Sequence, residues 1–104
     1  MTMPALRNYI GGEWVESASG KSFDVFNPAT GEVMATATAS NKADVDRAVQ
    51  AARAAYEKWR LYPAPKRGEI LYRAGEIMVR RKEELAREMT REMGKVLAES
   101  RGDV

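Results

Sequence analysis

The sequence predicts an α+β fold, in which N-terminal β-hairpins are followed by two or three helices. Residues 1–40 alternate strand formers with turn signals, whereas residues 41–104 carry apolar side chains at helical spacing. Charge follows the same division, with 2 basic and 4 acidic residues in the first part and 15 basic and 11 acidic in the second. We therefore divide the 104 residues into a β-hairpin region (1–40) and a helical region (41–104).

The first predicted hairpin turns at residues 11–13, Gly-Gly-Glu. Tyr9-Ile10 precedes this segment and Trp14-Val15 follows it, and both pairs favour strands. Because tight hairpin turns need residues that adopt positive φ, two glycines in a row are a strong signal. A further turn is predicted at residues 19–21.

The second predicted hairpin is closed by NPATGE, residues 27–32. Residues 22–26 and 32–39 alternate in polarity on either side of it, as strands do. Pro28 favours the first central position of a type I turn, and Asn27 suits the position before it. Gly31 permits the left-handed conformation that lets the chain reverse.

Residues 41–61 are predicted to form the first helix. Ser40 or Asn41 suits the N-cap, and Asp44 carries a charge that favours the first turn. Pro63 ends the pattern. Six residues share one helical face: Val45, Ala48, Val49, Ala52, Tyr56 and Trp59.

Beyond Pro65, residues 66–93 are predicted to form a longer helical stretch. The charged run at 80–84 indicates a kink or a short break, and Gly94 suits a C-terminal cap. Residues 96–104 begin a further helical pattern. The apolar stripe consists of Ile70, Leu71, Ala74, Ile77, Met78, Leu85, Met89 and Met93. Its three methionines are interpreted as core side chains, not as a cofactor site.

The chain lacks several residue types and motifs on which catalysis depends. It has no cysteine and no histidine, which removes thiolate nucleophiles, disulfides, imidazole bases and thiolate metal sites. Neither of the common glycine-rich phosphate-binding motifs is present. No run of apolar residues is long enough to span a membrane, and the N-terminus has no apolar signal segment, so a cytoplasmic location is expected.

The basic character of the chain does not predict nucleic-acid binding. Its net charge is only +2, and the one dense basic run, residues 80–82, is followed at once by Glu83 and Glu84. Nucleic-acid binders usually present a basic surface that acids do not offset. A solvated helix face of mixed charge is the simpler interpretation.

Five segments occur together in the order and spacing of one enzyme family: YIGGEWV, NPATGEV, ADVDRAVQAARAAYEKW, PAPKRGEIL and EMGKVLAESRGDV. With them the chain resembles the N-terminal region of the aldehyde dehydrogenase superfamily, and most closely its antiquitin branch, which oxidises α-aminoadipic semialdehyde. The resemblance implies that the chain is part of the α/β NAD-binding domain of a larger fold, and that NPATGEV is an architectural turn.

In that family a cysteine thiolate attacks the aldehyde, hydride passes to NAD or NADP, and a glutamate activates water. The resemblance places these groups beyond residue 104, so it implies no catalytic residue, no cofactor-binding residue and no cofactor for this chain alone. It implies a monovalent cation site formed by the carbonyl of Val25 and the side chain of Asp103. The alternative is that Asp103 is an ordinary surface carboxylate.

Two functional hypotheses remain open at this point. In the first, the chain is the N-terminal part of an NAD(P)-dependent aldehyde dehydrogenase, its catalytic domain is absent, and its partners are the remainder of the subunit and further copies in a homo-oligomer. In the second, it is a non-enzymatic interaction module that binds a partner, or itself, through exposed apolar helix faces. Both hypotheses predict exposed apolar faces on the helices.

Overall fold

A computed structural model describes residues 3–104, which divide into two compact units. The first unit comprises the residues up to Phe26 together with Val33–Leu61, and the second comprises Asn27–Glu32 together with Tyr62–Val104. The expected α+β class is confirmed, and each unit is described below by itself.

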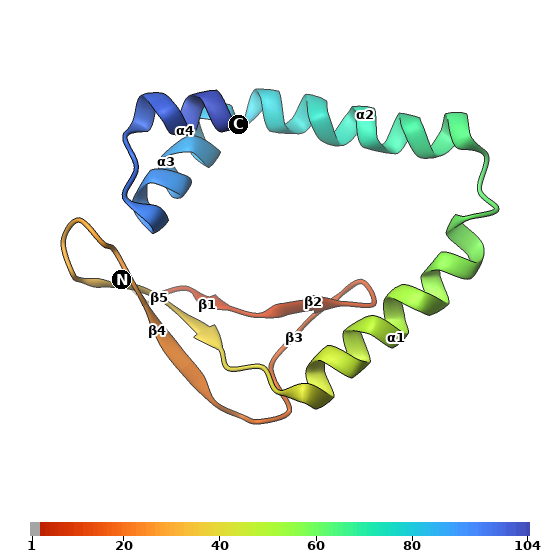
Figure 1. The fold of residues 1–104 in the computed structure, drawn as a ribbon, viewed down its shortest axis with the longest axis horizontal. Helices are drawn as coiled ribbons and strands as arrows, with labels where there is room; N and C mark the ends of the chain where they lie inside the picture. Colours follow the sequence, from red (N-terminus) through yellow and green to blue (C-terminus); the bar gives the residue numbers. More distant parts are fainter. Residues whose placement is uncertain (1–2) are drawn as a thin grey trace. The chain divides into compact units, whose positions relative to one another are not determined.

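Five short strands form two sheets in the first unit (Figure 1). Strand β5 (Val33–Thr38) lies between β4 (Ser22–Phe26), which is antiparallel to it, and β1 (Ala5–Leu6), which is parallel. Strands β2 (Asn8–Ile10) and β3 (Glu13–Val15) form a separate antiparallel pair. Strand β1 was not predicted, because its two residues carry no periodic pattern and its pairing is entirely long-range.

The first predicted hairpin is confirmed. Gly11 and Gly12 adopt φ values of 61° and 85°, and they form the two-residue connection between β2 and β3. Glu13 lies in β3 rather than in the turn. The rings of Tyr9 and Trp14, which are cross-strand partners, lie with their centroids 4.9 Å apart.

The second predicted hairpin is also confirmed, with a wider turn than a type I turn. The N–H of Gly31 donates to the carbonyl of Asn27 at 2.8 Å, so the closing bond spans one residue more than a type I turn does. The amide oxygen of Asn27 accepts from the N–H of Ala29 at 2.9 Å. Strand β5 is one residue shorter at each end than the predicted strand over residues 32–39.

Helix α1 (Lys42–Trp59) begins at a capping box that decides between the two predicted N-caps. The side chain of Asn41 accepts from the N–H of Asp44 at 3.1 Å, and the carboxylate of Asp44 accepts from the N–H of Asn41 at 2.9 Å. Each side chain therefore satisfies a backbone donor that the first helical turn leaves unpaired.

The second unit contains helices α2 (Ala64–Arg80), α3 (Lys82–Met93) and α4 (Leu97–Asp103), and α3 and α4 lie side by side (Figure 1). The described residues thus form four helices, where the sequence predicted two or three. The charged run does contain a break, at Arg81. Helix α2 starts two residues earlier than predicted, because proline is tolerated in a first helical turn.

The turn at residues 27–32 packs against the corner between α3 and α4 within the second unit. Gly94 ends α3 in the left-handed conformation, with φ 80° and ψ 7°, as predicted. A Cβ atom built on Gly94 would lie 3.0 Å from Cγ of Pro28. Glycine is therefore required here both by its φ and by the proximity of Pro28.

The apolar helix faces are exposed, as predicted. Among residues 3–104 only two hydrophobic side chains, Ala35 and Ala86, are buried, and no residue of α2 is buried. The interpretation of Met78 and Met93 as core side chains is wrong for this chain taken alone, because they are 48% and 60% exposed. None of the described helices is both long enough and apolar enough to cross a membrane.

Candidate functional site

The most tightly organised polar cluster in the first unit surrounds the carboxylate of Asp44, which is 2% exposed. This carboxylate accepts hydrogen bonds from the hydroxyl of Ser17, from the N–H of Ala18 at 3.0 Å and from the N–H of Asn41 at 2.9 Å. The first two donors lie in the segment between β3 and β4, so the cluster ties that segment to the start of α1.

The same contacts lower the pKa of Asp44 to about 2. The hydrogen bond from Ser17 is the largest cause, followed by those from the backbone of Ala18 and Asn41, while Arg47 contributes least. Burial acts in the opposite direction and is outweighed. The folded state therefore favours the ionised carboxylate.

We expect acid to destabilise the first unit through Asp44. Because the pKa is depressed on folding, its contribution is fully present above the ordinary value of 3.8 and is lost as the pH falls through about 2. Urea unfolding followed by circular dichroism between pH 5 and pH 2 measures this loss. The pKa of Glu83 is also lowered to about 2, chiefly by its hydrogen bond from Arg101, so the Asp44→Asn variant is the necessary reference. Identical pH profiles for the two proteins would exclude a contribution from Asp44.

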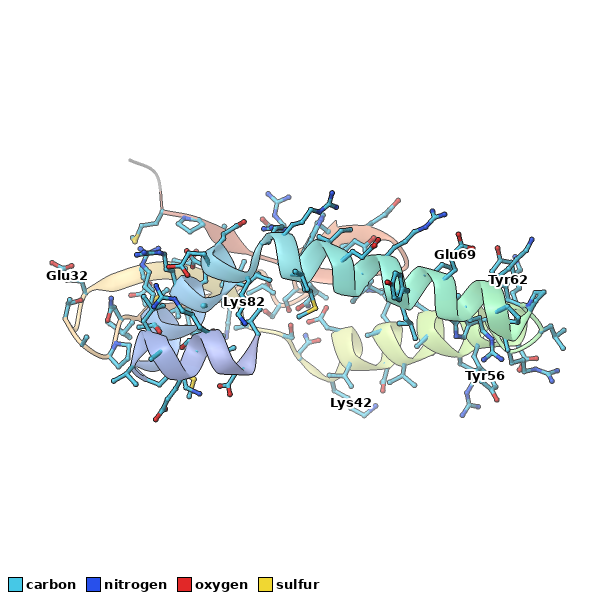
Figure 2. The ribbon with its side chains drawn as sticks, turned by 90° about the horizontal axis from the view of Figure 1, so that it is seen from above. Glu32, Lys42, Tyr56, Tyr62, Glu69 and Lys82 are labelled. Atoms are coloured by element: carbon cyan, nitrogen blue, oxygen red, sulfur yellow. The ribbon has the colours of Figure 1, made fainter. Side chains whose placement is uncertain are left out.

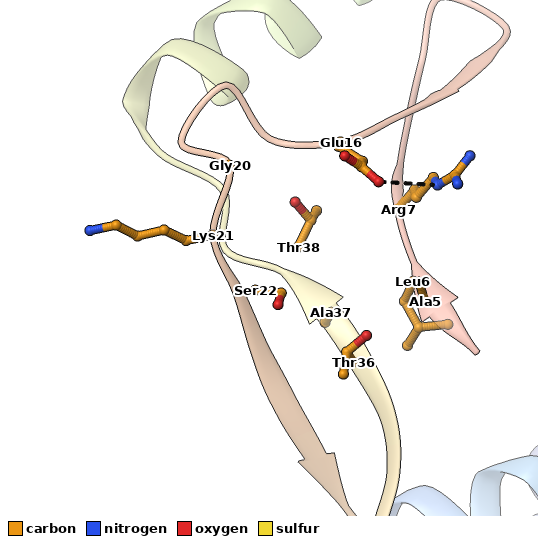
Figure 3. Close-up of a pocket in the computed structure, with 10 residues that line it drawn as sticks. All are labelled: Ala5, Leu6, Arg7, Glu16, Gly20, Lys21, Ser22, Thr36, Ala37 and Thr38. Atoms are coloured by element: carbon orange, nitrogen blue, oxygen red, sulfur yellow. Dashed lines mark ion pairs between the residues drawn. The ribbon is translucent and has the colours of Figure 1, made fainter. Parts of the chain in front are cut away.

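A second feature of the first unit is a polar pocket of about 200 Å³ beside strands β1, β4 and β5 (Figure 3). Hydroxyls of Ser22, Thr36 and Thr38 line it, and Arg7 Nε lies 3.9 Å from Glu16 Oε1 at its edge. Binding pockets for small ligands usually enclose about 300–1,000 Å³. At about 200 Å³, this pocket lies below that range.

The two residues of the predicted cation site lie in different units. Val25 belongs to β4, where it pairs with Ala35 of β5 beside an irregularity in the ladder. Asp103 ends α4 in the second unit, and its carboxylate forms an ion pair with the ammonium of Lys95. Within residues 3–104 no group of three or more acidic side chains is arranged to hold a metal. The cation site stays a prediction, in which Lys95 competes for the carboxylate.

The sequence did not predict the side-chain hydrogen bonds that connect α3 with α4. The guanidinium of Arg101 donates two hydrogen bonds to the carboxylate of Glu83, at 2.7 and 2.8 Å, and the hydroxyls of Thr90 and the fully buried Ser100 lie 2.8 Å apart. Glu83 had been interpreted only as part of a solvated charged run. Glu83 also pairs with Arg87 at helical spacing, but Arg101 lies 18 residues away, where helical spacing carries no signal.

The described residues combine two small sheets, a capped α1 and three further helices. This segment matches the NAD-binding domain fold of larger dehydrogenases. The family model described as "Aldehyde dehydrogenase family" matches residues 14–104, and the chain belongs to that family.

Curated relatives extend the match over nearly the whole chain. A malonate-semialdehyde dehydrogenase from Oceanobacillus iheyensis is 47% identical over 99% of this chain, and one from Geobacillus kaustophilus is 50% identical over 95%. The chain spans only 21% and 20% of their lengths, about one fifth. These relatives support the aldehyde dehydrogenase family, and they do not support the antiquitin branch specifically.

Solved structures give the same result. Betaine aldehyde dehydrogenase from Staphylococcus aureus, in complex with NAD⁺, shares 40% identity with a TM-score of 0.89 over 93% of this chain and 20% of its own. Succinate-semialdehyde dehydrogenase from Burkholderia pseudomallei shares 41% identity with a TM-score of 0.91 over 94% of this chain and 20% of its own. The backbone of this chain is therefore similar to that of the corresponding parts of much longer subunits.

Proposed function

We propose that this chain is the N-terminal part of an NAD(P)-dependent aldehyde dehydrogenase, which as a whole oxidises an aldehyde to a carboxylic acid. The observation that carries the proposal is the family match over residues 14–104, in a chain that spans one fifth of its relatives. The partners are then the remainder of the subunit and further copies in a homo-oligomer. A cytoplasmic location belongs to the same proposal.

For the substrate of the whole protein we propose a short semialdehyde. Two relatives at 47% and 50% identity are named for malonate semialdehyde, which favours this compound over the α-aminoadipic semialdehyde of the antiquitin branch. For the cofactor we propose NAD or NADP, with NAD favoured because a structure at 40% identity was solved with NAD⁺.

In that activity this chain supports the fold of the subunit and supplies no catalytic residue. The family reaction needs a cysteine thiolate, and the chain has no cysteine and no histidine. Among the described residues, the polar side chains best held in place, those around Asp44, fix a loop to a helix. The cation bound by Val25 and Asp103 remains part of this proposal, with a structural role.

The endogenous protein that contains this segment tests the proposal. We expect its intact mass to be about five times the 11.6 kDa of this chain, because 103 residues cover 21% of a relative. Supplied with malonate semialdehyde and NAD, the purified endogenous protein should form NADH, and the purified 104-residue chain should form none. If the chain alone formed NADH, the proposal that it supplies no catalytic group would be wrong. If the endogenous protein had a mass of 11.6 kDa, the proposal that the chain belongs to a longer dehydrogenase would be wrong.

The second candidate is a non-enzymatic interaction module. The exposed apolar side chains of α1, among them Val45, Val49 and Tyr56 at 56–57% exposure, favour it. It predicts an endogenous protein of the size of this chain that is recovered in a complex. The same mass measurement therefore distinguishes the two candidates.

A further inference from the structure

The side chains that are fully buried where α3 and α4 meet are small. Helices α3 and α4 lie side by side (Figure 1), and Ser100 of α4 is completely buried. Ala86 of α3, also completely buried, lies between Glu83 and Thr90 on the face of α3 that bonds to α4. Leu97, the one large apolar side chain in α4, is only partly buried. Because the hydrophobic gain scales with buried apolar area, alanine and serine contribute little to it.

Side-chain hydrogen bonds therefore account for much of the attachment of α4 to α3. Arg101 donates from Nε and Nη2 to the two oxygens of the Glu83 carboxylate, at 2.8 and 2.7 Å. In this bidentate geometry an exposed ion pair contributes more than such pairs usually do. The hydroxyls of Thr90 and Ser100 form a further bond between the two helices, at 2.8 Å.

Glu83 has an alternative partner on its own helix. Arg87 Nη2 lies 3.0 Å from Glu83 Oε1, the same oxygen that Arg101 Nη2 approaches at 2.7 Å. A glutamate four residues before an arginine is well placed for such a pair in a helix. The two guanidinium groups share one carboxylate oxygen, so departure of Arg101 would allow Arg87 to bind the whole carboxylate. Separation of α4 from α3 therefore does not leave Glu83 without a partner.

Helix α3 is stabilised at both ends by groups that do not belong to α4. At its start, Arg81 Nε donates to the Glu84 carboxylate at 2.9 Å, and Glu84 adds a negative charge in the first turn, where the helix dipole favours it. At its end, Gly94 supplies the left-handed cap. The ion pair of Lys95 with Asp103 lies on the α4 side of this cap, so it needs no contact with α3.

We propose that α4 is a latch that opens from α3 as a unit, while α3 stays folded and the Glu83 carboxylate passes from Arg101 to Arg87. The closed state contains the bidentate pair with Arg101 and the bond between the hydroxyls of Thr90 and Ser100. The open state contains the pair of Glu83 with Arg87, and water binds the two hydroxyls. This inference goes beyond the proposed function and does not depend on it.

Hydrogen exchange of this chain, followed by mass spectrometry of peptides from residues 82–93 and 97–104, tests the proposal. We expect the backbone N–H groups of α4 to exchange at least about tenfold faster than those of α3 in the chain without substitutions, because α4 opens without α3. Equal rates in the two helices would mean that they unfold together, and would overturn the proposal.

Arg101→Gln removes the pair that closes the latch. We expect exchange in α4 to rise about three- to tenfold, while exchange in α3 changes by less than about twofold. Arg91→Gln is the matched control, because the Arg91 side chain is similarly exposed, 51% against 45%, and lies 4.0 Å from Glu88 within α3. It should leave exchange in α4 unchanged. If Arg101→Gln raised exchange in both helices equally, or in neither, α4 would not be a latch held by this pair.

Arg87→Gln tests the change of partner. This substitution removes the group that binds Glu83 in the open state, so α4 should open less often and exchange at least about twofold more slowly than in the native chain. An arginine that only stabilised α3 would not slow exchange in α4 when removed. Unchanged or faster exchange in α4 would show that Glu83 does not pass to Arg87, and the proposal would be wrong.

Discussion

Replacing Asp44 with alanine is expected to lower the midpoint of thermal unfolding of the first unit by roughly 10 °C. The substitution removes a carboxylate that is 2% exposed and accepts from Ser17, Ala18 and Asn41. The N–H groups of Ala18 and Asn41 lose this acceptor, and the Ser17 hydroxyl keeps only Ser19 Oγ, 2.9 Å away. Breaking a hydrogen-bond network around a buried carboxylate is among the few mechanisms that give large effects. Circular dichroism of this chain during heating measures the midpoint.

Asp46 provides the matched control, because it lies in the same helix and its side chain is 52% exposed beside Lys42. Asp46→Ala should shift the midpoint by no more than about 2 °C, since an exposed ion pair contributes little. Asp44→Asn should lie between the two variants, because an amide keeps one acceptor oxygen but loses the charge. Equal midpoints for Asp44→Ala and Asp46→Ala would show that the cluster does not hold the loop on α1.

The sequence was sufficient wherever the signal was local. The two adjacent glycines, which adopt positive φ, correctly predicted the first hairpin, and Gly94 correctly predicted the end of α3. The N-cap of α1 was narrowed to two neighbouring residues, one of which is correct. Each of these features depends on the conformational preference of one or two residues, and that preference is readable without knowledge of what lies nearby.

The sequence was insufficient wherever two distant segments meet. Asp44 was predicted only to favour a helix start, yet the largest cause of its lowered pKa is the hydrogen bond from the hydroxyl of Ser17, 27 residues away. The two-residue strand β1 depends on its pairing with β5. Periodicity describes which residues share a face but not which segment packs on that face. For the same reason, Met78 on α2 was correctly predicted to belong to an apolar stripe and wrongly interpreted as core, since it is 48% exposed.

Replacing Gly94 with alanine is the second change for which we expect a large effect, a loss of about 1–3 kcal/mol from the free energy of unfolding of the second unit. Two costs combine. Alanine is strained at φ 80°, and its Cβ would lie 3.0 Å from Cγ of Pro28. Urea unfolding of this chain, followed by circular dichroism, measures the loss.

Gly102 in α4 supplies a control, because replacing it with alanine should not lower the free energy of unfolding. Its φ is not positive, and a Cβ atom there would meet nothing within 4 Å. Gly102→Ala should therefore leave stability unchanged or raise it by up to about 1 kcal/mol, as alanine does in helices. If Gly94→Ala behaved in the same way, the left-handed cap would not be required.

The double variant Pro28→Ala with Gly94→Ala separates the two costs at this corner. Removing Cγ of Pro28 relieves the 3.0 Å contact but leaves the strain of alanine at φ 80°. If the contact matters, Gly94→Ala costs less in the Pro28→Ala background than in the native chain, and the difference is the coupling energy between turn and corner. Strict additivity would mean that backbone strain alone makes glycine necessary, and that the NPATGE turn is held at the corner by other contacts.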